Sequence, residues 1–154
     1  MSNLVYQHTQ IGYLIIYITI AIVAYFSYIS VIAGFKIIIA IFMVLIVMIL
    51  ASFTSLKVTL NQQYLKIKFG YGLYQKKIVV REIKFVQIVK NHWYYGWGIR
   101  YWLWPKMTIF NISGFEAVEI KMRDGRIYRI GTDQPQKLAY AIKMQLQKIN
   151  QVRF

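Results

Sequence analysis

The sequence predicts an α+β membrane protein: a hairpin of two transmembrane helices, then a small domain of antiparallel strands, then one closing helix. Three observations support this prediction. The stretch from Ile11 to Phe53 is apolar and contains a single charged residue, Lys36. From residue 54 to 130, apolar and polar residues mostly alternate, which is typical of strands with one buried face. Between Leu138 and Ile149, apolar residues recur at spacings of three and four, which marks one face of a helix.

The apolar stretch divides into two candidate membrane helices, residues 11–33 and 37–53. A bilayer core takes about 20 apolar residues per helix, so the second segment is close to the short limit. Two core helices of a soluble protein are disfavoured because neither segment has a polar face. A cleaved signal peptide is disfavoured because residues 1–10 contain no Lys or Arg. Neither segment contains Asp, Glu, Arg or His, which indicates an anchor and not an ion pathway.

The connection at residues 34–36 is so short that the two helices must be antiparallel neighbours. The tail at 1–10 and the domain at 54–154 therefore share one side of the membrane. Of the 19 Lys and Arg residues, 18 follow the hairpin. Because cytoplasmic segments carry the excess of Lys and Arg, both termini of this multi-pass protein are predicted to be cytoplasmic.

The net charge of +14 indicates an anionic partner. A basic domain beside a membrane most simply faces anionic lipid headgroups, and each cation near such a surface contributes about 1 kcal/mol. Nucleic acid is not expected, because no motif of the usual recognition modules is present. The alternative is that the charge serves only orientation and solubility.

The domain is expected to contain six or seven antiparallel strands. They are predicted at residues 56–60, 65–69, 74–80, 83–90, 107–112, 117–122 and 126–130. Asp124-Gly125 indicates a two-residue type I′ turn, and Glu119 is predicted to lie on an exposed strand face. Thr132 or Asp133 is expected to cap the last helix, with Pro135 in its first turn.

Basic residues on these strands are the first candidate site. We expect contacts with lipid headgroups from Lys57, Lys66, Lys68, Lys76, Lys77 and Arg81. The alternative is a solvated strand face without a ligand.

The segment 91–105, NHWYYGWGIRYWLWP, is the second candidate site and contains all four tryptophans. Tryptophan and tyrosine favour membrane interfaces and are also frequent in protein interfaces. Membrane insertion or partner docking is therefore predicted for Trp93, Tyr94, Tyr95, Trp97, Arg100, Trp102 and Trp104. Arg100 is expected to stack on a neighbouring ring. The alternative is that these aromatic residues form strands and core of the domain.

The sequence contains few candidate catalytic or metal-binding residues. The chain has no cysteine, and its two histidines, His8 and His92, have no metal-ligand spacing. The five carboxylates are accounted for by turns, a cap, an exposed face and a basic neighbourhood. We therefore predict no enzymatic activity, cofactor or metal, with His92 as the best remaining catalytic candidate.

Three motifs support a family resemblance: Gly-Ile-Arg at 98–100, Gly-x-x-Ala-Val-Glu-Ile at 114–120 and Gly-Thr-Asp-x-Pro at 131–135. Over about residues 10–148 the chain resembles bacterial pleckstrin-homology-like proteins that have two amino-terminal membrane helices. The resemblance implies a bent barrel or sandwich of two near-orthogonal sheets, closed by the last helix, at the bacterial inner membrane. It implies no activity. The lipid-binding motif of eukaryotic domains of this fold has only a loose echo in Lys57, Lys66 and Lys68, and is not carried over.

The expected function is a non-enzymatic binding or scaffold module that acts at the cytoplasmic membrane surface and contacts anionic lipid. The alternative is a protein-docking or self-assembly module that uses the Trp-rich segment or an exposed strand edge, without selective lipid binding.

Overall fold

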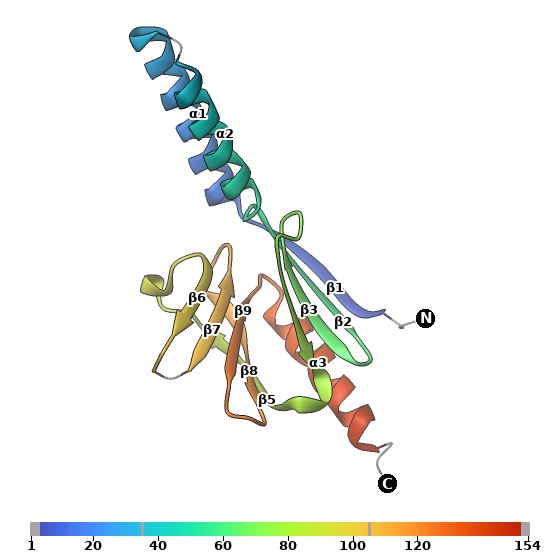
Figure 1. Cartoon of the computed structure of the whole chain (residues 1–154). Coiled ribbons are helices and arrows are strands. Elements are labelled where there is room, and N and C mark those ends of the chain that lie inside the picture. The colour runs from blue at the N-terminus through green and yellow to red at the C-terminus, as the bar shows by residue number, and fades with distance from the viewer. Residues whose placement is uncertain (1–3, 35, 105, 152–154) are drawn as a thin grey trace.

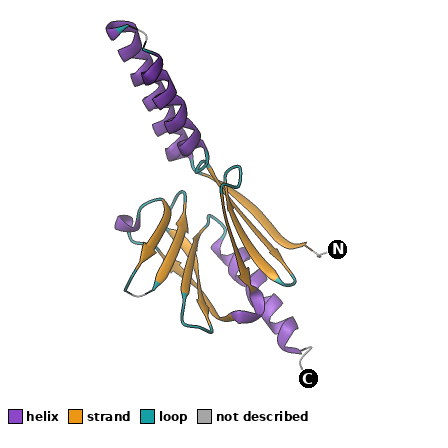
Figure 2. Ribbon diagram, in the orientation of Figure 1, coloured by secondary structure: helices purple, strands orange, loops and turns teal. Residues whose placement is uncertain are grey.

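The computed structural model describes residues 4–34, 36–104 and 106–151. It confirms an α+β architecture with two helices, antiparallel and mixed sheets, and a C-terminal helix. The two helices project together from one end of a domain that is built from two sheets and the last helix (Figure 1). Colouring by secondary structure separates the helical hairpin from the strands, which make up most of the domain (Figure 2).

The first sheet begins before the helical hairpin. Its strands are β1 (Leu4–Ile11), β2 (Ser55–Asn61), β3 (Tyr64–Phe69) and β4 (Tyr74–Val79), in the order β1-β2-β3-β4. All neighbours are antiparallel. The prediction treated residues 1–10 as a tail, whereas strand β1 pairs with β2 from Leu4 opposite Asn61 to Ile11 opposite Ser55. The helical hairpin is therefore an insertion between two paired strands.

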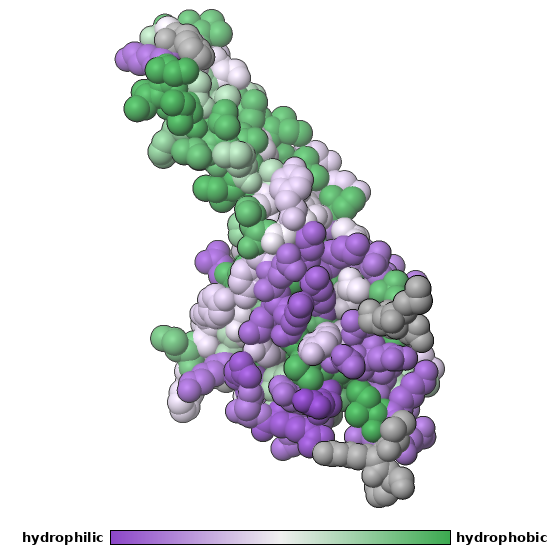
Figure 3. All heavy atoms as spheres, turned by 45° about the vertical axis from the view of Figure 1, so that its right-hand side comes forward, coloured by the Kyte–Doolittle hydropathy of each residue, from purple (hydrophilic) through white to green (hydrophobic). Residues whose placement is uncertain are grey.

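The hairpin consists of α1 (Tyr13–Ala33) and α2 (Ile37–Ala51). Neither helix contains a buried residue. The face of the hairpin that Figure 3 shows is mostly hydrophobic. Among the helices that the structure describes, α1 alone has the length and hydropathy of a candidate membrane span, and it lies near the N-terminus. Helix α2 ends at Ala51 and not at residue 53, so its 15 residues extend about 22 Å, less than a bilayer core of about 30 Å.

The second sheet has the strand order β5-β8-β9-β7-β6. Its strands are β5 (Ile83–Lys90), β6 (Gly98–Trp102), β7 (Met107–Asn111), β8 (Glu116–Met122) and β9 (Ile127–Gly131). The prediction of purely antiparallel strands is wrong for one pair, because β7 lies parallel to β9. Alternation of apolar and polar residues identifies a strand but not its neighbours in the sheet. The sequence therefore did not indicate that β7 would pair with β9 on the side away from β8.

The turn between β8 and β9 differs from the predicted type I′ turn. Met122 donates its backbone N–H to the carbonyl oxygen of Arg126 over 2.9 Å, which leaves three residues in the loop. Gly125 has φ of +86°, whereas no described residue other than glycine has a positive φ. A type I′ turn requires positive φ at both central residues, so Asp124 does not form one.

The core lies between the two sheets and helix α3 (Pro135–Gln151), which packs on β5, β8 and β1. Leu138 and Ile142 carry the predicted apolar face of α3 into this core, where both are fully buried. The predicted cap at Thr132 or Asp133 is wrong, because the first helical hydrogen bond runs from Leu138 N–H to the carbonyl oxygen of Gln134, which is therefore the N-cap residue. The Thr132 hydroxyl oxygen accepts the backbone N–H of Gln134 over 3.1 Å, which forms a turn just before the helix. Among the described residues no strand pairing joins the two sheets, so the domain is not a closed barrel.

Buried amide groups tie the base of the hairpin to the second sheet through the loop 112–115. Gln10 donates from Nε2 to the hydroxyl oxygen of Ser113 over 2.9 Å. Asn111 donates from Nδ2 to the carbonyl oxygen of Gly114 over 3.1 Å. The side chains of Gln10 and Asn111 are both buried. Strand β1 and the second sheet are thereby fixed relative to each other where the helices begin.

Candidate functional site

Four of the six predicted headgroup-contacting residues gather on the outer face of the first sheet. Alternate residues of β2 and β3, such as Leu56 and Ile67, face the core and are buried. The intervening positions therefore face outward. They include Lys57 on β2, Lys66 and Lys68 on β3, and Lys77 on β4, which together we call the lysine face.

The register places these lysines directly opposite one another. Lys57 pairs with Lys68, and Lys66 pairs with Lys77. Like charges in opposed positions of adjacent strands are destabilising. The ion pairs within the described part of the chain involve other residues: His8–Asp133, Arg126–Asp124 and Arg129–Glu119. The lysine face is therefore a concentration of positive charge without a neutralising carboxylate among the described residues.

The lysine face begins beside the base of the helical hairpin. Strand β2 starts at Ser55, only four residues after α2 ends, so Lys57 and its partner Lys68 lie near the helix end. The β3–β4 turn, residues 70–73, returns to the same place. Gly70 donates its N–H to the carbonyl oxygen of Ser55 over 2.8 Å. A Cβ on Gly70 would lie within 2.4 Å of the Ser52 carbonyl oxygen.

Two apolar side chains project from this turn, and sequence reasoning missed them. Tyr71 is 79% exposed and Leu73 is 80% exposed. The ammonium group of Lys68 lies over the turn, because a Cβ on Gly72 would come within 3.2 Å of its Nζ. The sequence did contain a signal for them. Tyr71 lies between Gly70 and Gly72, and Leu73 follows Gly72, whereas a solvent-exposed turn normally carries polar residues. A cation and two exposed apolar side chains thus lie together beside the helix end.

The other two predicted basic residues lie apart from the lysine face. Lys76 belongs to the opposite face of β4, and its Nζ lies 5.5 Å from the centre of the Tyr128 ring. Arg81 lies in the short 3₁₀ helix η1 (Val80–Glu82), at the end of β4 that is remote from the β3–β4 turn. The sequence suggested one basic surface because the six residues are close in the chain.

The Trp-rich segment is on the surface and not in the core. Trp93, Tyr94 and Tyr95 form a second 3₁₀ helix, η2 (Trp93–Tyr95). Trp93 is 79% exposed and Trp104 is 93% exposed, and Trp97 is also exposed. Trp102 contacts Tyr95 edge-on, with ring centres 5.2 Å apart. This excludes the alternative that the four tryptophans fill the core.

The cation that lies over a ring of this segment, within the described residues, is Arg129 and not Arg100. Its guanidinium carbon is 5.6 Å from the centre of the Tyr95 ring. Arg129 also donates from Nε to Glu119 Oε2 over 2.7 Å. Glu119, predicted to be exposed, is only 5% exposed, because the aromatic layer and Arg129 cover this face of the second sheet.

Strand β6 carries the Trp-rich segment along the full length of β7. Gly98 is opposite Asn111, near the loop that contacts the hairpin base, whereas Trp102 is opposite Met107 at the other end of β7. Four residues of a strand span about 13 Å. The ring of Trp102 nevertheless packs on η2, with its centre 6.3 Å from that of Tyr94.

The residues considered for catalysis are separated from one another. His8 pairs with Asp133, with 2.5 Å between Nε2 and Oδ1. His92 stacks on the Tyr94 ring, with ring centres 5.0 Å apart. No group of three potential metal ligands occurs among the residues that the structure describes.

Comparison of the chain with models of known families, with curated proteins and with solved structures finds no match.

Proposed function

We propose that this protein is a non-enzymatic binding module, anchored by its helical hairpin, whose lysine face and β3–β4 turn contact anionic lipid headgroups. The single observation that carries the proposal is the insertion of the hairpin between β1 and β2. Because both helices join the sheet directly, Lys57, Lys68 and the exposed Tyr71 lie beside the point where the chain would leave the bilayer. Cations near an anionic surface and apolar side chains at its interface are both favourable there.

Two membrane crossings are proposed, although α2 is short. Helix α2 packs antiparallel on α1 and returns to the same sheet, so a hairpin that enters the bilayer must leave it on the side of entry. Lys36 precedes α2 at the tip, and its long side chain can reach the far interface. The proposed location is the bacterial cytoplasmic membrane, with both termini in the cytoplasm, because 18 of 19 basic residues follow the hairpin.

The crossing can be tested by single-cysteine labelling, because the chain has no cysteine of its own. Lys36→Cys and Gln62→Cys variants of the full chain are reconstituted in sealed vesicles and treated with a membrane-impermeant maleimide. Labelling of the two positions from opposite sides supports two crossings. Labelling of both from one side contradicts them and indicates a hairpin held within one leaflet.

Lipid contact can be tested with a fluorophore at Leu73→Cys and, as a control, at Gln63→Cys in the β2–β3 turn. Each full-length variant is placed in nanodiscs that contain nitroxide-labelled lipid, with either neutral or anionic lipid as the remainder. We expect quenching at position 73 that increases with anionic lipid, and little quenching at position 63. Equal quenching at both positions would refute the proposed orientation.

The proposed fold family is still the pleckstrin-homology-like group, as the sequence resemblance implied. Two sheets packed face to face and closed by a C-terminal helix support it. The parallel β7–β9 pair and the insertion of helices after β1 depart from a simple antiparallel arrangement. The β6–β7 hairpin, which carries Arg100 and Trp102, is best described as an addition to the edge of the second sheet.

A second candidate function is protein docking or self-assembly through the Trp-rich segment. It is favoured by the exposure of Trp93 and Trp104. Exposed tryptophans are frequent hot spots of protein interfaces. The mass of the detergent-solubilised full chain, compared with that of a Trp93→Ala and Trp104→Ala double variant, tests self-assembly. An unchanged monomeric mass in both would exclude it.

A further inference from the structure

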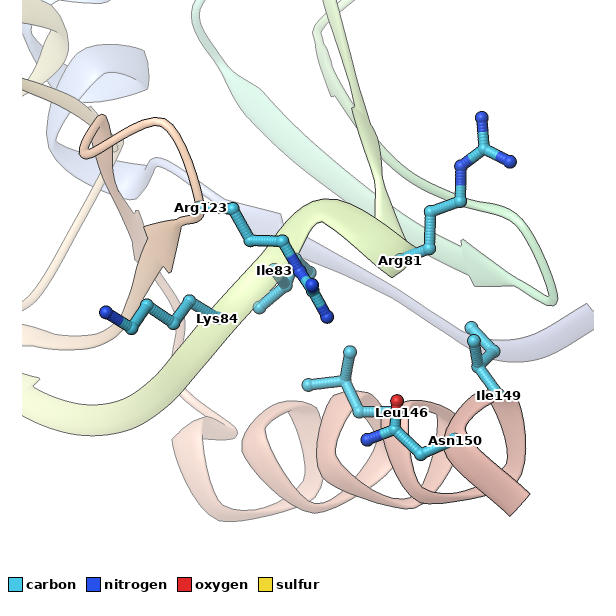
Figure 4. Close-up of a pocket in the computed structure, with 7 residues that line it drawn as sticks. All are labelled: Arg81, Ile83, Lys84, Arg123, Leu146, Ile149 and Asn150. Atoms are coloured by element: carbon cyan, nitrogen blue, oxygen red, sulfur yellow. The ribbon is translucent and has the colours of Figure 1, made fainter. Parts of the chain in front are cut away.

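A basic hollow lies at the end of the domain opposite the helical hairpin. It has a volume of about 470 Å³ and lies between η1, the end of β8 and the C-terminal half of α3 (Figure 4). A neighbouring hollow of about 340 Å³ shares Arg81 and Ile149 with it and continues to the β2–β3 turn at Gln62 and Gln63. We call the two hollows together the distal groove.

Hydrogen bonds fix the walls of the distal groove. Arg123 donates its backbone N–H to the carbonyl oxygen of Glu82 over 2.9 Å, which joins the β8 wall to η1. The buried Gln145 of α3 donates from Nε2 to the carbonyl oxygen of Gln62 over 3.2 Å. Val80 donates its N–H to the carbonyl oxygen of Gln63 over 2.9 Å. A groove that is already formed loses less conformational entropy when a ligand binds.

The lining combines cations with an apolar floor. Arg81, Lys84 and Arg123 supply the charge, and no ion pair joins them to a carboxylate in the described part of the chain. Leu146 and Ile149 of α3 supply the apolar surface. Glu82 lies between two of these cations in the sequence, but it does not line the groove.

The three cations point in different directions. Arg123 projects across the gap towards α3, whereas Arg81 and Lys84 point outward on either side of it (Figure 4). A compact anion such as phosphate could not contact all three as they lie. Separate carboxylates along an extended chain could, with an apolar side chain between them on Leu146 and Ile149. We infer that the distal groove binds an extended acidic peptide segment with an apolar side chain, supplied by another protein.

Charge and position exclude other occupants. A second copy of this chain is a poor source of acidic peptide, because it has five carboxylates, of which Glu119, Asp124 and Asp133 already form ion pairs. Lipid headgroups lie at the other end of the first sheet if the hairpin is in the bilayer. Strand β2 separates the two ends by about 23 Å, more than the Debye length of about 8 Å at physiological salt. The inference goes beyond the proposed lipid contact and does not depend on it.

The test uses the full chain in nanodiscs of neutral lipid, so that it is independent of anionic lipid. A fluorescent octapeptide of alternating Glu and Leu is titrated and its anisotropy is followed. We expect saturable binding that weakens with salt, and a loss of about tenfold or more in affinity for Arg123→Gln. Lys84→Gln should also weaken binding, and a matched control, Lys121→Gln on the outer face of β8, should not. Peptides with Gln for Glu, or with Ser for Leu, should bind more weakly.

Three results would overturn the inference. The first is no saturable binding of the octapeptide up to about 1 mM. The second is equal affinity for the Arg123→Gln and Lys121→Gln variants, which would mean that the peptide associates with positive charge anywhere on the surface. The third is displacement of the peptide by an equal concentration of inorganic phosphate, which would indicate a site for a compact anion. The variants' unfolding temperatures are measured alongside, because Arg123 and Lys84 are exposed and their replacement should not unfold the domain.

Discussion

Gly12 donates its backbone N–H to the carbonyl oxygen of Thr54 over 2.8 Å. Gly12 is the residue between β1 and α1, and Thr54 is the residue just before β2. This bond continues the β1–β2 pairing one step beyond Ile11 and Ser55. The helices therefore join the first sheet without a flexible linker on either side. A tilt of the hairpin would be passed to β1 and β2, and through them to the orientation of the lysine face.

The junction between the hairpin and the first sheet should not tolerate even a methyl group at Gly70. Gly70 has φ of +43°, and a Cβ there would approach the Ser52 carbonyl oxygen to 2.4 Å. We expect Gly70→Ala to lower the free energy of unfolding by about 1–2 kcal/mol through the left-handed backbone and by about 1–3 kcal/mol more through the clash. Gly125→Ala is the matched control, since Gly125 has φ of +86° but open space around its Cα. Thermal unfolding in detergent compares the two, and equal losses would contradict the close approach.

One substitution in the lysine face should raise the stability of the fold and weaken its contact with lipid. Lys57→Glu would face Lys68 across β2 and β3 and replace a repulsive pair with an attractive one. The free energy of unfolding should rise by about 0.2–1 kcal/mol. Lipid-dependent quenching at position 73 should fall, because positive charge beside the membrane is lost.

The control for Lys57→Glu is Lys121→Glu, which changes the net charge equally on the other sheet. Lys121 lies opposite Phe85 and Ile127, so no like-charge pair is relieved. Its quenching should match that of the unmodified chain. A gain in stability for Lys121→Glu as large as for Lys57→Glu would show that net charge, and not the opposed pair, is responsible.

The sequence was sufficient for the elements whose pattern is strong. Uninterrupted apolar stretches identified the two helices, and alternation identified β2 to β5 and β7 to β9. Strand β1 was missed because LVYQHTQ carries polar residues on both faces, and only its pairing with β2 makes Tyr6, His8 and Gln10 inward-facing. The parallel β7–β9 neighbours were missed because alternation contains no information on strand order.

The candidate site was predictable as far as spacing along one strand allows. Lys66 and Lys68 share a face because they are two residues apart, and this follows from the sequence. Their opposition to Lys77 and Lys57 depends on register, which turn lengths set. Lys76 was assigned to the same surface although one residue of offset places it on the other face of β4. Glu119 was assigned to solvent because the covering layer comes from η2, an irregular segment.

The hydroxyl pair of Tyr74 and Tyr101 should give the fold a dependence on alkaline pH. Their oxygen atoms are 3.2 Å apart, and burial, together with this hydrogen bond, raises the pKa of Tyr74 above its usual value near 10. A pKa that is raised in the folded state means that the stabilising contribution is complete below the unfolded pKa. It is lost as the pH rises through the folded pKa. Tyr74→Phe should therefore lose less stability than the unmodified chain as the pH rises above about 10, the pKa of tyrosine in the unfolded chain.

Urea unfolding at several alkaline pH values measures this dependence. At neutral pH, the free energy of unfolding of Tyr74→Phe should already be lower by about 1 kcal/mol, because the hydrogen bond to Tyr101 is lost. Tyr64→Phe is the control, since Tyr64 lies on the outer face of β3 and is exposed. Parallel pH profiles for Tyr74→Phe and the unmodified chain would show that another group controls alkaline unfolding.

The buried carboxylate of Glu119 joins three elements of the second sheet and its aromatic cover. Its Oε1 accepts from Gln87 Nε2 over 2.8 Å, its Oε2 accepts from Arg129 Nε over 2.7 Å, and Arg129 lies over the Tyr95 ring. Glu119→Gln leaves a mostly buried guanidinium without its counter-charge. The free energy of unfolding should fall by about 3 kcal/mol, since one partner of a buried ion pair is removed.

A double-mutant cycle separates this effect from the packing of Arg129. Arg129→Met keeps an apolar side chain under Tyr95, and adding it to Glu119→Gln should recover part of the lost stability. The coupling free energy between the two sites should reach about 1–3 kcal/mol, which is typical of residues in direct contact. Trp102, which packs on Tyr95, should change its fluorescence emission in Glu119→Gln and recover in the double variant. Strict additivity of the two substitutions would mean that the aromatic layer is held in place without the ion pair.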